Sequence, residues 1–421
     1  MNAWIGLGSN QGDRRENLEK AAGLLIERAR PASYQAAPIL RSPALMPAGA
    51  PADWNIPFLN SALLLDWNGT APDLLALLKQ IELDLGRQPS PRWSPRPIDL
   101  DLLALGDQVF KNESLQLPHP EMANRQFVLS PLKYFAATRK IAGLGKTVLQ
   151  LARARPDALP LWMGIVNVTP DSFSEKNPAP LAQDKLKLFD EFGVHIVDLG
   201  AESTRPGAIP LSPQQEWNRL APLMDWWIGR TRTRIFKPIL SVDTYHPETA
   251  ARAIAMGAGM VNDVSGLADA KMLEVLADSR AQYVLMHSLS VPADPKRTLQ
   301  AEDPVNEVLS WARTQLARLQ EHGISLDRVI FDPGIGFGKT AAQSWALVRS
   351  IERFYELPVR LLAGHSRKSF IQYLHAGEAA DRDAETLGLS LNLATRGVDI
   401  LRVHDPLTQQ RAFHAFQEGT V

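Results

Sequence analysis

The segment from Arg92 to Asp101 brings two arginines and two aspartates close together, with Arg96 and Asp99 between its ends. Alternate residues of a β-strand share a face, so Asp99 and Asp101 would lie about 7 Å apart on one side. The residues that alternate with them are apolar: Ile98, Leu100 and Leu102. Carboxylates for metal beside cations for phosphate are what phosphoryl transfer requires. The alternative interpretation is a solvated edge strand beside an arginine loop at the surface.

A second group of chemically useful residues recurs at the ends of eight short apolar runs. In a (β/α)8 barrel the active site lies at the carboxyl ends of the strands. A turn after each strand would explain any one polar residue there, but not all eight positions together. The residues are Asn167 and Asp171, Asp198, Asp243, Asn262 and Asp263, His287, Asp332, His365, Arg402 and His404.

Their types predict a site for a heterocycle and a polyanion. Asp243 and Asp332 would be buried carboxylates, which need partners, and with Asn262 they suit a ring edge rich in N–H groups. Asn167, with a nearby acid, suits Mg²⁺. "GIGFGK" (334–339) lacks the Walker pattern, so we interpret it as a substrate loop. A basic set suited to a polyanion is also present: Arg367, Lys368, Arg402 and His404.

The elements that must position the first group form an α+β pattern. Apolar runs at 3–9, 58–67 and 94–103 predict strands. Helices are predicted at 14–29 and at 71–86, where Gly86 marks the end. Strands interleaved with two helices favour a ferredoxin-like sandwich. On the first helix four residues share the apolar side: Leu18, Ala21, Ala22 and Leu25.

The second group is carried by eight strand-like runs, each followed by a helix-like segment, between about 159 and 421. Near-continuous apolar runs are typical of parallel strands buried on both faces. Eight such units in about 260 residues predict a (β/α)8 TIM barrel. Pro and charged residues near 152–160 predict the junction, so we expect domains at 1–157 and 158–421.

Length and composition limit the protein class. A chain of 421 residues is too long for one ordinary core, and a net charge of −1 gives no overall attraction to nucleic acid or acidic membranes. The absence of cysteine excludes disulfides and thiolate chemistry and is typical of a reducing compartment. Without a signal peptide or a long apolar run, we expect a soluble cytoplasmic protein.

Paired tryptophans beside a basic run, "MDWWIGRTRTR" (224–234), allow two interpretations. They would suit a nucleic-acid or membrane patch. We favour a barrel helix whose aromatic side faces the core.

Seven motifs of the second block resemble dihydropteroate synthases, in order: "MGIVNVTPDSFS", "DLGAESTRPGA", "SVDTY", "NDVSG", "DPGIGFGK", "GHSRKS" and "RVHD". That family joins 6-hydroxymethyl-7,8-dihydropterin diphosphate to p-aminobenzoate and releases pyrophosphate. The resemblance implies that Asp243 stabilises a cation on the pterin methylene. Residues implied for the pterin are Asp243, Asn262, Met286, Asp332 and Lys368. Those implied for pyrophosphate and its Mg²⁺ are Asn167, Arg402 and His404. Those implied for p-aminobenzoate are Thr204, Arg205, Pro206, Phe173, Phe337 and Ser366.

The first block resembles 6-hydroxymethyl-7,8-dihydropterin pyrophosphokinases through "GLGSNQGD", "RSPAL", "FLNSALLL", "IELDLGR", "RWSPRPIDLDLL", "LPHP" and "NRQFVLSPL". That family transfers diphosphate from ATP to the pterin hydroxymethyl group. By resemblance Asp99 and Asp101 bind two Mg²⁺. The residues implied for ATP are Glu82, Arg87, Arg92, Trp93, Arg96, His119 and Arg125. Those implied for the pterin are Ser42, Pro43, Ala44, Leu45, Phe58, Asn60 and Phe127.

We therefore predict a bifunctional folate-pathway enzyme in which one domain makes the other's substrate. Its partners would be ATP, the pterin and p-aminobenzoate, without nucleic acid or membrane, and a homodimer through the barrel stays open. One alternative for the barrel is a pterin-binding methyltransferase with a corrinoid partner, against which "GHSRKS" and "STRPGA" argue. Another is a first domain that only binds or regulates, against which the pair Asp99 and Asp101 argues.

Overall fold

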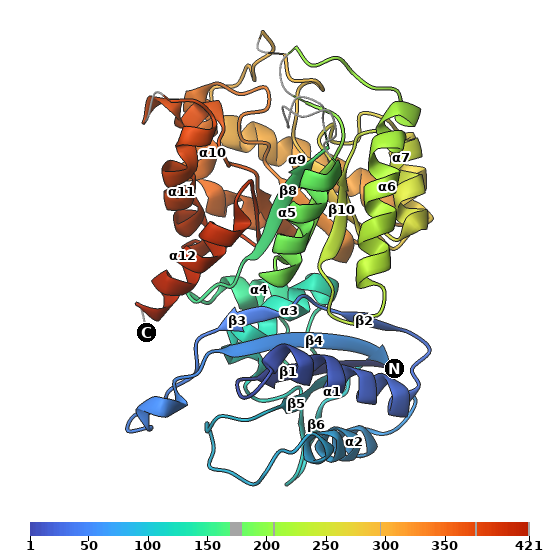
Figure 1. The fold of residues 1–421 in the computed structure, drawn as a ribbon, viewed down its shortest axis with the longest axis vertical. Coiled ribbons are helices and arrows are strands. Elements are labelled where there is room, and N and C mark those ends of the chain that lie inside the picture. Colours follow the sequence, from blue (N-terminus) through green and yellow to red (C-terminus); the bar gives the residue numbers. More distant parts are fainter. Residues whose placement is uncertain (169–178, 205–206, 295, 375–376, 420–421) are drawn as a thin grey trace. The chain divides into compact units, whose positions relative to one another are not determined.

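The computed structural model describes residues 1–168, 179–204, 207–294, 296–374 and 377–419 (Figure 1). The chain divides into two compact units. Unit 1 comprises Met1–Leu159, Thr233–Lys237 and His414–Val421, and unit 2 comprises Pro160–Arg232 and Pro238–Phe413. Among the described residues, no helix is long and apolar enough to cross a membrane.

Unit 1 is built on an antiparallel sheet of strand order β2–β4–β1–β5, with β3 also paired to β4. Its strands are β1 (Asn2–Ser9), β2 (Tyr34–Ala36), β3 (Leu40–Ser42), β4 (Phe58–Asp66), β5 (Asp99–Leu105), β6 (Phe110–Lys111) and β7 (Gln116–Leu117). Its helices are α1 (Arg14–Ala29), α2 (Ala71–Asp84), α3 (Gln126–Ala136) and α4 (Val148–Arg153). This order and the two crossover helices α1 and α2 confirm the ferredoxin-like prediction.

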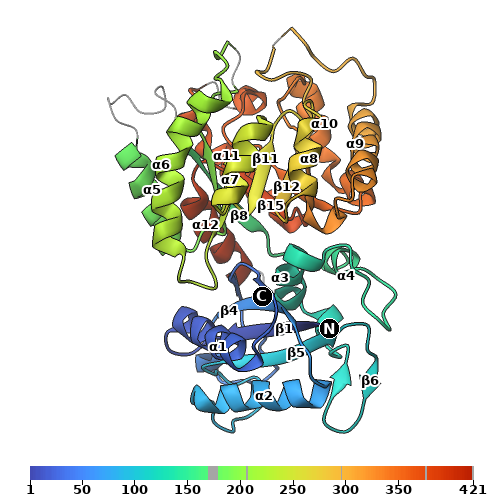
Figure 2. The ribbon, with the colours of Figure 1, turned by 90° about the vertical axis from the view of Figure 1, so that its right-hand side faces the viewer.

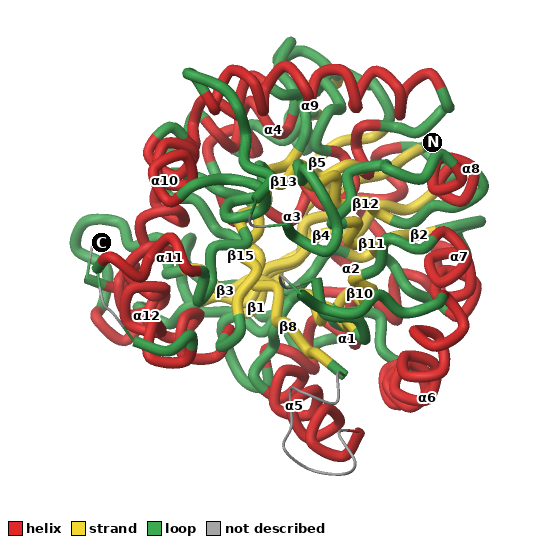
Figure 3. The backbone as a smooth tube through the Cα atoms, turned by 90° about the horizontal axis from the view of Figure 1, so that it is seen from above, coloured by secondary structure: helices red, strands yellow, loops and turns green. Residues whose placement is uncertain are grey.

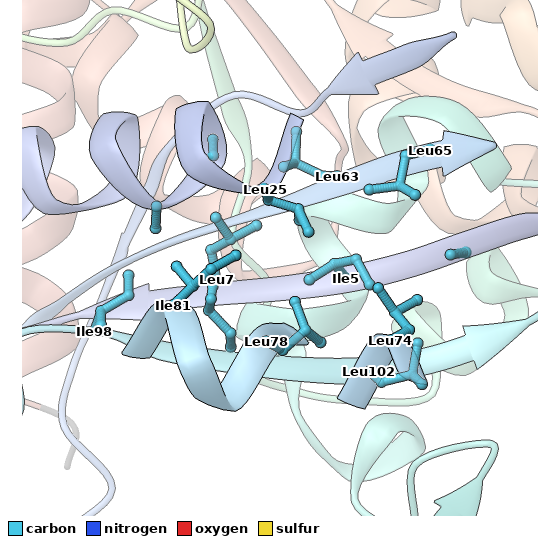
Figure 4. Close-up of a cluster of buried hydrophobic side chains, with 14 of the residues drawn as sticks. Ile5, Leu7, Leu25, Leu63, Leu65, Leu74, Leu78, Ile81, Ile98 and Leu102 are labelled. Carbon is cyan, nitrogen blue, oxygen red and sulfur yellow. The ribbon is translucent and has the colours of Figure 1, made fainter. Parts of the chain in front are cut away.

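Helices α1 and α2 pack against one face of the sheet (Figure 2). Asp13 caps α1 by accepting the Glu16 N–H, and the four residues predicted for its apolar side are the buried ones. Thr70 and Asp73 form a capping box at the start of α2. Figure 4 shows the resulting core, in which Leu25, Leu78 and Ile98 meet side chains of β1 and β4.

The opposite face of the sheet is covered by α3, so this sheet is buried on both sides. Trp4, Leu103 and Leu129 belong to that second core. Strand β5 therefore changes character along its length. Asp99 and Asp101 are partly exposed near its start, and Leu103 is buried further along the same face.

Unit 2 is a closed barrel of eight parallel strands in the order β10–β11–β12–β13–β14–β15–β8–β9, as predicted. The strands are β8 (Leu161–Asn167), β9 (Ile196–Gly200), β10 (Ile239–Asp243), β11 (Met260–Asp263), β12 (Gln282–Met286), β13 (Val329–Asp332), β14 (Arg360–Ala363) and β15 (Ile400–Val403). The helices are α5 (Ala179–Glu191), α6 (Pro213–Thr231), α7 (Pro247–Met256), α8 (Lys271–Ala277), α9 (Pro304–Glu321), α10 (Ala341–Arg349), α11 (Asp383–Thr395) and α12 (Pro406–Glu418), of which α12 belongs to this unit up to Phe413. Figure 3 shows these helices as a ring around the strands.

The tryptophan pair lies on α6. Trp227 is 1% exposed and belongs to the core between α5, α6 and the barrel strands. Trp226 is partly buried against the same core. The prediction of a barrel helix with its aromatic side inward is confirmed.

Candidate active sites

A pocket of about 390 Å³ lies in unit 1, where β1, β3, β4 and β5 meet the loops around residues 87–96 and 119–128. The structure brings together every residue predicted for the first site except Ala44 and Glu82. These are Ser42, Pro43, Leu45, Phe58, Asn60, Arg87, Arg92, Trp93, Arg96, Asp99, Asp101, His119, Arg125 and Phe127. The pocket also contains Lys79 and Glu121, which the sequence interpretation did not include.

Asp99 lies between two arginines in this pocket. Its carboxylate accepts hydrogen bonds from Arg87 Nη1 at 2.5 Å and from Arg96 Nη1 at 3.3 Å. Gly8 pairs with Asp99 across the sheet, and a Cβ on Gly8 would lie 3.1 Å from Asn60 Oδ1. A residue without a side chain at this position therefore leaves room between the Asn60 amide and the Asp99 carboxylate.

Glu82 lies behind the pocket. It is 3% exposed, accepts the Leu100 N–H at 2.7 Å, and forms ion pairs with Lys79 and Arg87. Burial raises the pKa of Glu82, although Lys79 opposes this effect. The structure thus places Glu82 as a buried anchor for Arg87 and β5.

Asp101 is the more enclosed of the two aspartates. Burial is the main cause that raises the pKa of Asp101, and the charge of Asp99 is the second. Burial also lowers the pKa of His119, against the pull of Asp101. Repulsion between the two like charges is therefore present, but it raises the pKa of Asp101 less than burial does.

The carboxylate pair suits a divalent ion that is shared with a substrate. Among the described residues, no group of three or more His, Asp or Glu side chains is arranged to hold a metal. Mg²⁺ is commonly bound by one or two carboxylates together with substrate phosphates and water. Asp99 and Asp101 fit that pattern.

Aromatic rings and arginines line the rest of the pocket. Arg92 and Arg125 stack on Trp93, at 4.9 and 5.6 Å from guanidinium carbon to ring centroid. Trp93 has a positive φ of 76°, a strained conformation for such a residue. Asn60 Nδ2 donates to Ser42 Oγ at 2.9 Å, which fixes the amide beside Phe58.

In unit 2 the polar strand ends meet around one guanidinium group. Arg402 donates from Nε to Asp198 at 2.7 Å and from Nη2 to Asp243 at 2.6 Å. Asn262 Nδ2 donates to Asp198 at 3.2 Å. Burial raises the pKa of Asp243 to about 7, although Arg402 draws it down.

A second charged pair lies at the end of β13. Burial raises the pKa of Asp332 and lowers that of Lys368 to about 8, and each charge opposes the other's shift. Lys368 Nζ lies 4.4 Å from the Phe337 ring centroid and donates to the Ile335 carbonyl. The structure therefore holds Lys368 between an acid and an aromatic ring.

Of the remaining residues predicted for the barrel site, some lie beside residues of this site and others fall outside the described residues. Ser366 Oγ and His404 Nδ1 are 2.9 Å apart, and Met286 ends β12 beside Asp332. A Cβ on Gly200 would lie 3.4 Å from both Asn167 Oδ1 and Asp243 Cβ, so this glycine separates these two neighbouring side chains. Thr204 is partly buried and accepts the Ala293 N–H through its carbonyl. Outside the described residues lie Asp171, Phe173, Arg205 and Pro206.

Arg367, predicted for the polyanion site, is paired with an acidic side chain of another element, and its role at the site stays a prediction. Its guanidinium forms two hydrogen bonds to Asp383 on α11, at 2.6 and 2.7 Å. Its backbone has a positive φ of 59°, between Ser366 and Lys368.

Lys339, at the end of "GIGFGK", points inward. It is 8% exposed and contacts His287 Nδ1 at 2.9 Å and the carbonyls of Gly334 and Phe337 at 2.9 and 3.0 Å. Burial lowers the pKa of Lys339 to about 7. This lysine holds the loop that carries Phe337, a role that the local sequence did not indicate.

Comparison with known proteins matches both units. A family model described as 7,8-dihydro-6-hydroxymethylpterin-pyrophosphokinase covers residues 4–137, and one described as pterin binding enzyme covers residues 163–404. The chain is 36% identical to the folate synthesis bifunctional protein of Chlamydia trachomatis, over 99% of this chain and 98% of that one. It is 31% identical to a mitochondrial folate synthesis bifunctional protein of Arabidopsis thaliana, over 95% of this chain and 80% of that one.

Solved structures match the barrel. The dihydropteroate synthase of Xanthomonas albilineans with 4-aminobenzoic acid is 37% identical, with a TM-score of 0.57, over 62% of this chain and 93% of that one. That of Anaplasma phagocytophilum with 6-hydroxymethylpterin-monophosphate is 31% identical, with a TM-score of 0.57, over 62% and 99%.

The chain joins two enzyme domains that both act on pterins, which defines the class of bifunctional pterin enzymes. It belongs to the family of bifunctional folate-synthesis proteins. Its first domain transfers diphosphate from ATP to 6-hydroxymethyl-7,8-dihydropterin. Its second domain condenses that diphosphate with p-aminobenzoate to give 7,8-dihydropteroate and pyrophosphate.

Proposed function

We propose that Asp99 and Asp101 hold Mg²⁺ for the diphosphate transfer in the first domain. The observation that carries this proposal is their position on one face of β5, in a pocket that also contains Arg87, Arg92 and Arg96. When bound, Mg²⁺ would supply positive charge to offset the charge on the ATP phosphates while the diphosphate passes to the pterin hydroxyl and AMP leaves.

The chain's own residues perform the remaining work of that step. Arg92 and Arg96 bind the phosphates of ATP, because guanidinium forks match phosphate oxygens. Asn60 orients the pterin by hydrogen bonding, and Phe58 and Phe127 stack on its ring. On the nucleotide side we also place Trp93, His119, Arg125 and Arg87, and Glu82 acts there by holding Arg87. On the pterin side we also place Ser42, Pro43 and Leu45.

For the second domain we propose that Asp243 stabilises the positive charge on the pterin methylene as pyrophosphate leaves. Its burial beside Arg402 supports this role, since a fixed anion in an enclosed site acts most strongly on a developing cation. Asn262, Asp332 and Lys368 would bind the ring edge, with Met286 beside it.

The leaving group and the amine complete this site. Arg402 and His404 would receive pyrophosphate, with Asn167 as an oxygen ligand for Mg²⁺. The residues proposed for p-aminobenzoate are Thr204, Arg205, Phe337 and Ser366. Its amine then attacks the methylene carbon and loses a proton to solvent.

One assay tests both halves. Purified chain is supplied with ATP, Mg²⁺, hydroxymethyl-dihydropterin and p-aminobenzoate, and AMP, pyrophosphate and dihydropteroate are followed. We expect all three products from the wild type. A protein that forms dihydropteroate only from supplied diphosphate would favour the alternative of a first domain that does not catalyse.

Four further predictions belong to the proposal. The two activities would be bounded at residues 1–157 and 158–421. A cytoplasmic location and a homodimer through the barrel stay predictions, and gel filtration with light scattering tests the dimer. Binding of neither nucleic acid nor membrane is expected from the near-zero net charge.

A further inference from the structure

Asp198 is a buried carboxylate that contacts two of the proposed site residues but was not itself assigned a role. It lies on β9 and is 0% exposed. Its oxygens accept hydrogen bonds from Ser241 Oγ at 2.6 Å, Asn262 Nδ2 at 3.2 Å and Arg402 Nε at 2.7 Å. These donors come from three different strands, β10, β11 and β15, so one carboxylate links four strands of the barrel.

The contact with Asp198 determines how Arg402 presents its guanidinium. Nε is held by Asp198 and Nη2 by Asp243. Within the described part of the chain Nη1 makes no hydrogen bond, and the Arg402 side chain is 18% exposed. Two of the three nitrogens are therefore fixed by carboxylates, and the third can reach a ligand from the open end of the barrel.

The same carboxylate determines which atom Asn262 offers. A carboxylate oxygen only accepts, so the amide must turn its NH₂ group toward Asp198. The carbonyl oxygen Oδ1 then becomes the atom available to a substrate. An acceptor at this place suits the N–H groups of a pterin edge.

We propose that Asp198 is a positioning residue for the coupling reaction. It orients Arg402 so that Nη1 meets the leaving diphosphate, and it orients Asn262 so that Oδ1 meets the pterin. The inference rests on the proposed function, which places pyrophosphate at Arg402 and the ring at Asn262. Asp198 itself touches no substrate and acts through these two side chains.

The test measures the inhibition constant of pyrophosphate for the coupling reaction, together with KM for supplied dihydropterin diphosphate. Asp198→Asn keeps the shape but removes the charge and turns one acceptor into a donor. We expect both constants to rise about tenfold or more, because a charge-assisted contact that orients the ligand is lost. ATP-to-AMP turnover of the first domain in the same chain is the internal control.

Ser241→Ala is the matched control. It removes one hydrogen bond to Asp198 but leaves the carboxylate and its contact with Arg402, so the inhibition constant should change less than about threefold. A merely structural role for Asp198 would make both variants lower thermal stability without moving pyrophosphate affinity.

Two arginine variants extend the test, and the second of them, Arg402→Lys, does not depend on the folding of Asp198→Asn. Arg402→Met should weaken pyrophosphate inhibition, and Asp198→Asn should add nothing in that background. Arg402→Lys keeps the charge but not the three-nitrogen fork, and should weaken inhibition about tenfold.

Failure of this inference and failure of the proposed function give different results. If Arg402→Met weakens inhibition while Asp198→Asn and Arg402→Lys behave as wild type, the positioning role is overturned and the proposed function stands. If Arg402→Met leaves inhibition unchanged, pyrophosphate is not bound at Arg402, and the proposed placement falls together with this inference.

Discussion

The two sites share one arrangement, in which an arginine joins a buried carboxylate to a more exposed one. In the first domain Arg87 lies between Glu82 and Asp99, whose side chains are 4% and 28% exposed. In the barrel Arg402 lies between Asp198 and Asp243, whose side chains are 0% and 16% exposed. In each case the buried acid holds the arginine and the other acid faces the site.

The two arrangements differ in what holds the arginine. Arg87 follows Gly86, whose φ is +84°, in the loop after α2. Arg402 lies within strand β15, which is hydrogen-bonded on both sides. The divalent ion proposed at Asp99 would compete with Arg87 for the same carboxylate oxygens, and an arginine in a loop could move away from them. The barrel arginine is fixed in advance, which suits electrostatic stabilisation without reorganisation.

Replacing the exposed acid of the first domain should have the largest effect. Asp99→Ala removes a proposed metal ligand, so ATP-to-AMP turnover should fall about a thousandfold, as expected when charge neutralisation in phosphoryl transfer is lost. Coupling of supplied diphosphate with p-aminobenzoate is measured in the same preparation and should stay at the wild-type level. Residual turnover above about a tenth of wild type would show that Asp99 is not a required ligand.

The corresponding change in the barrel should be somewhat smaller. Asp243→Asn should slow coupling about a hundredfold, the usual cost of removing one preorganised stabilising group. Since burial raises the pKa of Asp243 to about 7, wild-type coupling should decline as pH falls through that value and the anion is lost. A rate profile for the variant that kept this decline would assign it to another group, and AMP formation serves as the control.

Local pattern was enough to predict the elements and the strand ends. The spacing of Leu18, Ala21, Ala22 and Leu25 predicted their common buried side, because apolar residues that repeat with the helical period lie on one face of the helix. The carboxyl ends of parallel strands meet at one edge, so Asp243 and Asn262, in neighbouring strands, had to lie together. Motif resemblance then supplied the roles that spacing could not.

Side-chain pairing over long distances was not predictable in this way. Asp198 and Arg402 are 204 residues apart, and the sequence around either residue does not indicate that the two side chains pair. Lys339 was expected at a substrate loop, but Gly334, Gly336 and Gly338 have positive φ values and curl the chain around its ammonium group. The direction of a side chain in such a loop depends on the enclosing strands, here on His287 after β12.

The buried anchor of the first domain offers a third test of the comparison. Glu82→Gln should lower the free energy of unfolding of this domain by about 1–3 kcal/mol, because the Leu100 N–H and Arg87 lose a charged acceptor. KM for ATP should rise only severalfold, since the loop can still place Arg87 at the phosphates. Asp84→Asn, on the same helix and paired with Arg28 near the surface, is the control and should destabilise the domain less than Glu82→Gln does.

The smallest expected effect concerns protons and metal at Asp101. Burial, followed by the charge of Asp99, raises its pKa, so a proton competes with Mg²⁺ more strongly here than at an ordinary aspartate. Lowering the pH protonates the ligand, so the Mg²⁺ concentration for half-maximal AMP formation should increase as pH falls, by at most about tenfold per pH unit. The measurement is a Mg²⁺ titration of initial rates at several pH values, with ATP saturating.

That titration separates the two sites, because Asp243, the carboxylate expected to titrate in the barrel, is already paired with Arg402. Coupling should lose rate at low pH through Asp243, and added Mg²⁺ should not restore it, whereas AMP formation should be restored by more Mg²⁺. An AMP-forming step whose Mg²⁺ requirement is independent of pH would mean that Asp101 is already ionised or is not a ligand. If Mg²⁺ restored both steps, the two sites would no longer differ in the way described, with a loop arginine that moves in the first domain and a fixed arginine in the barrel.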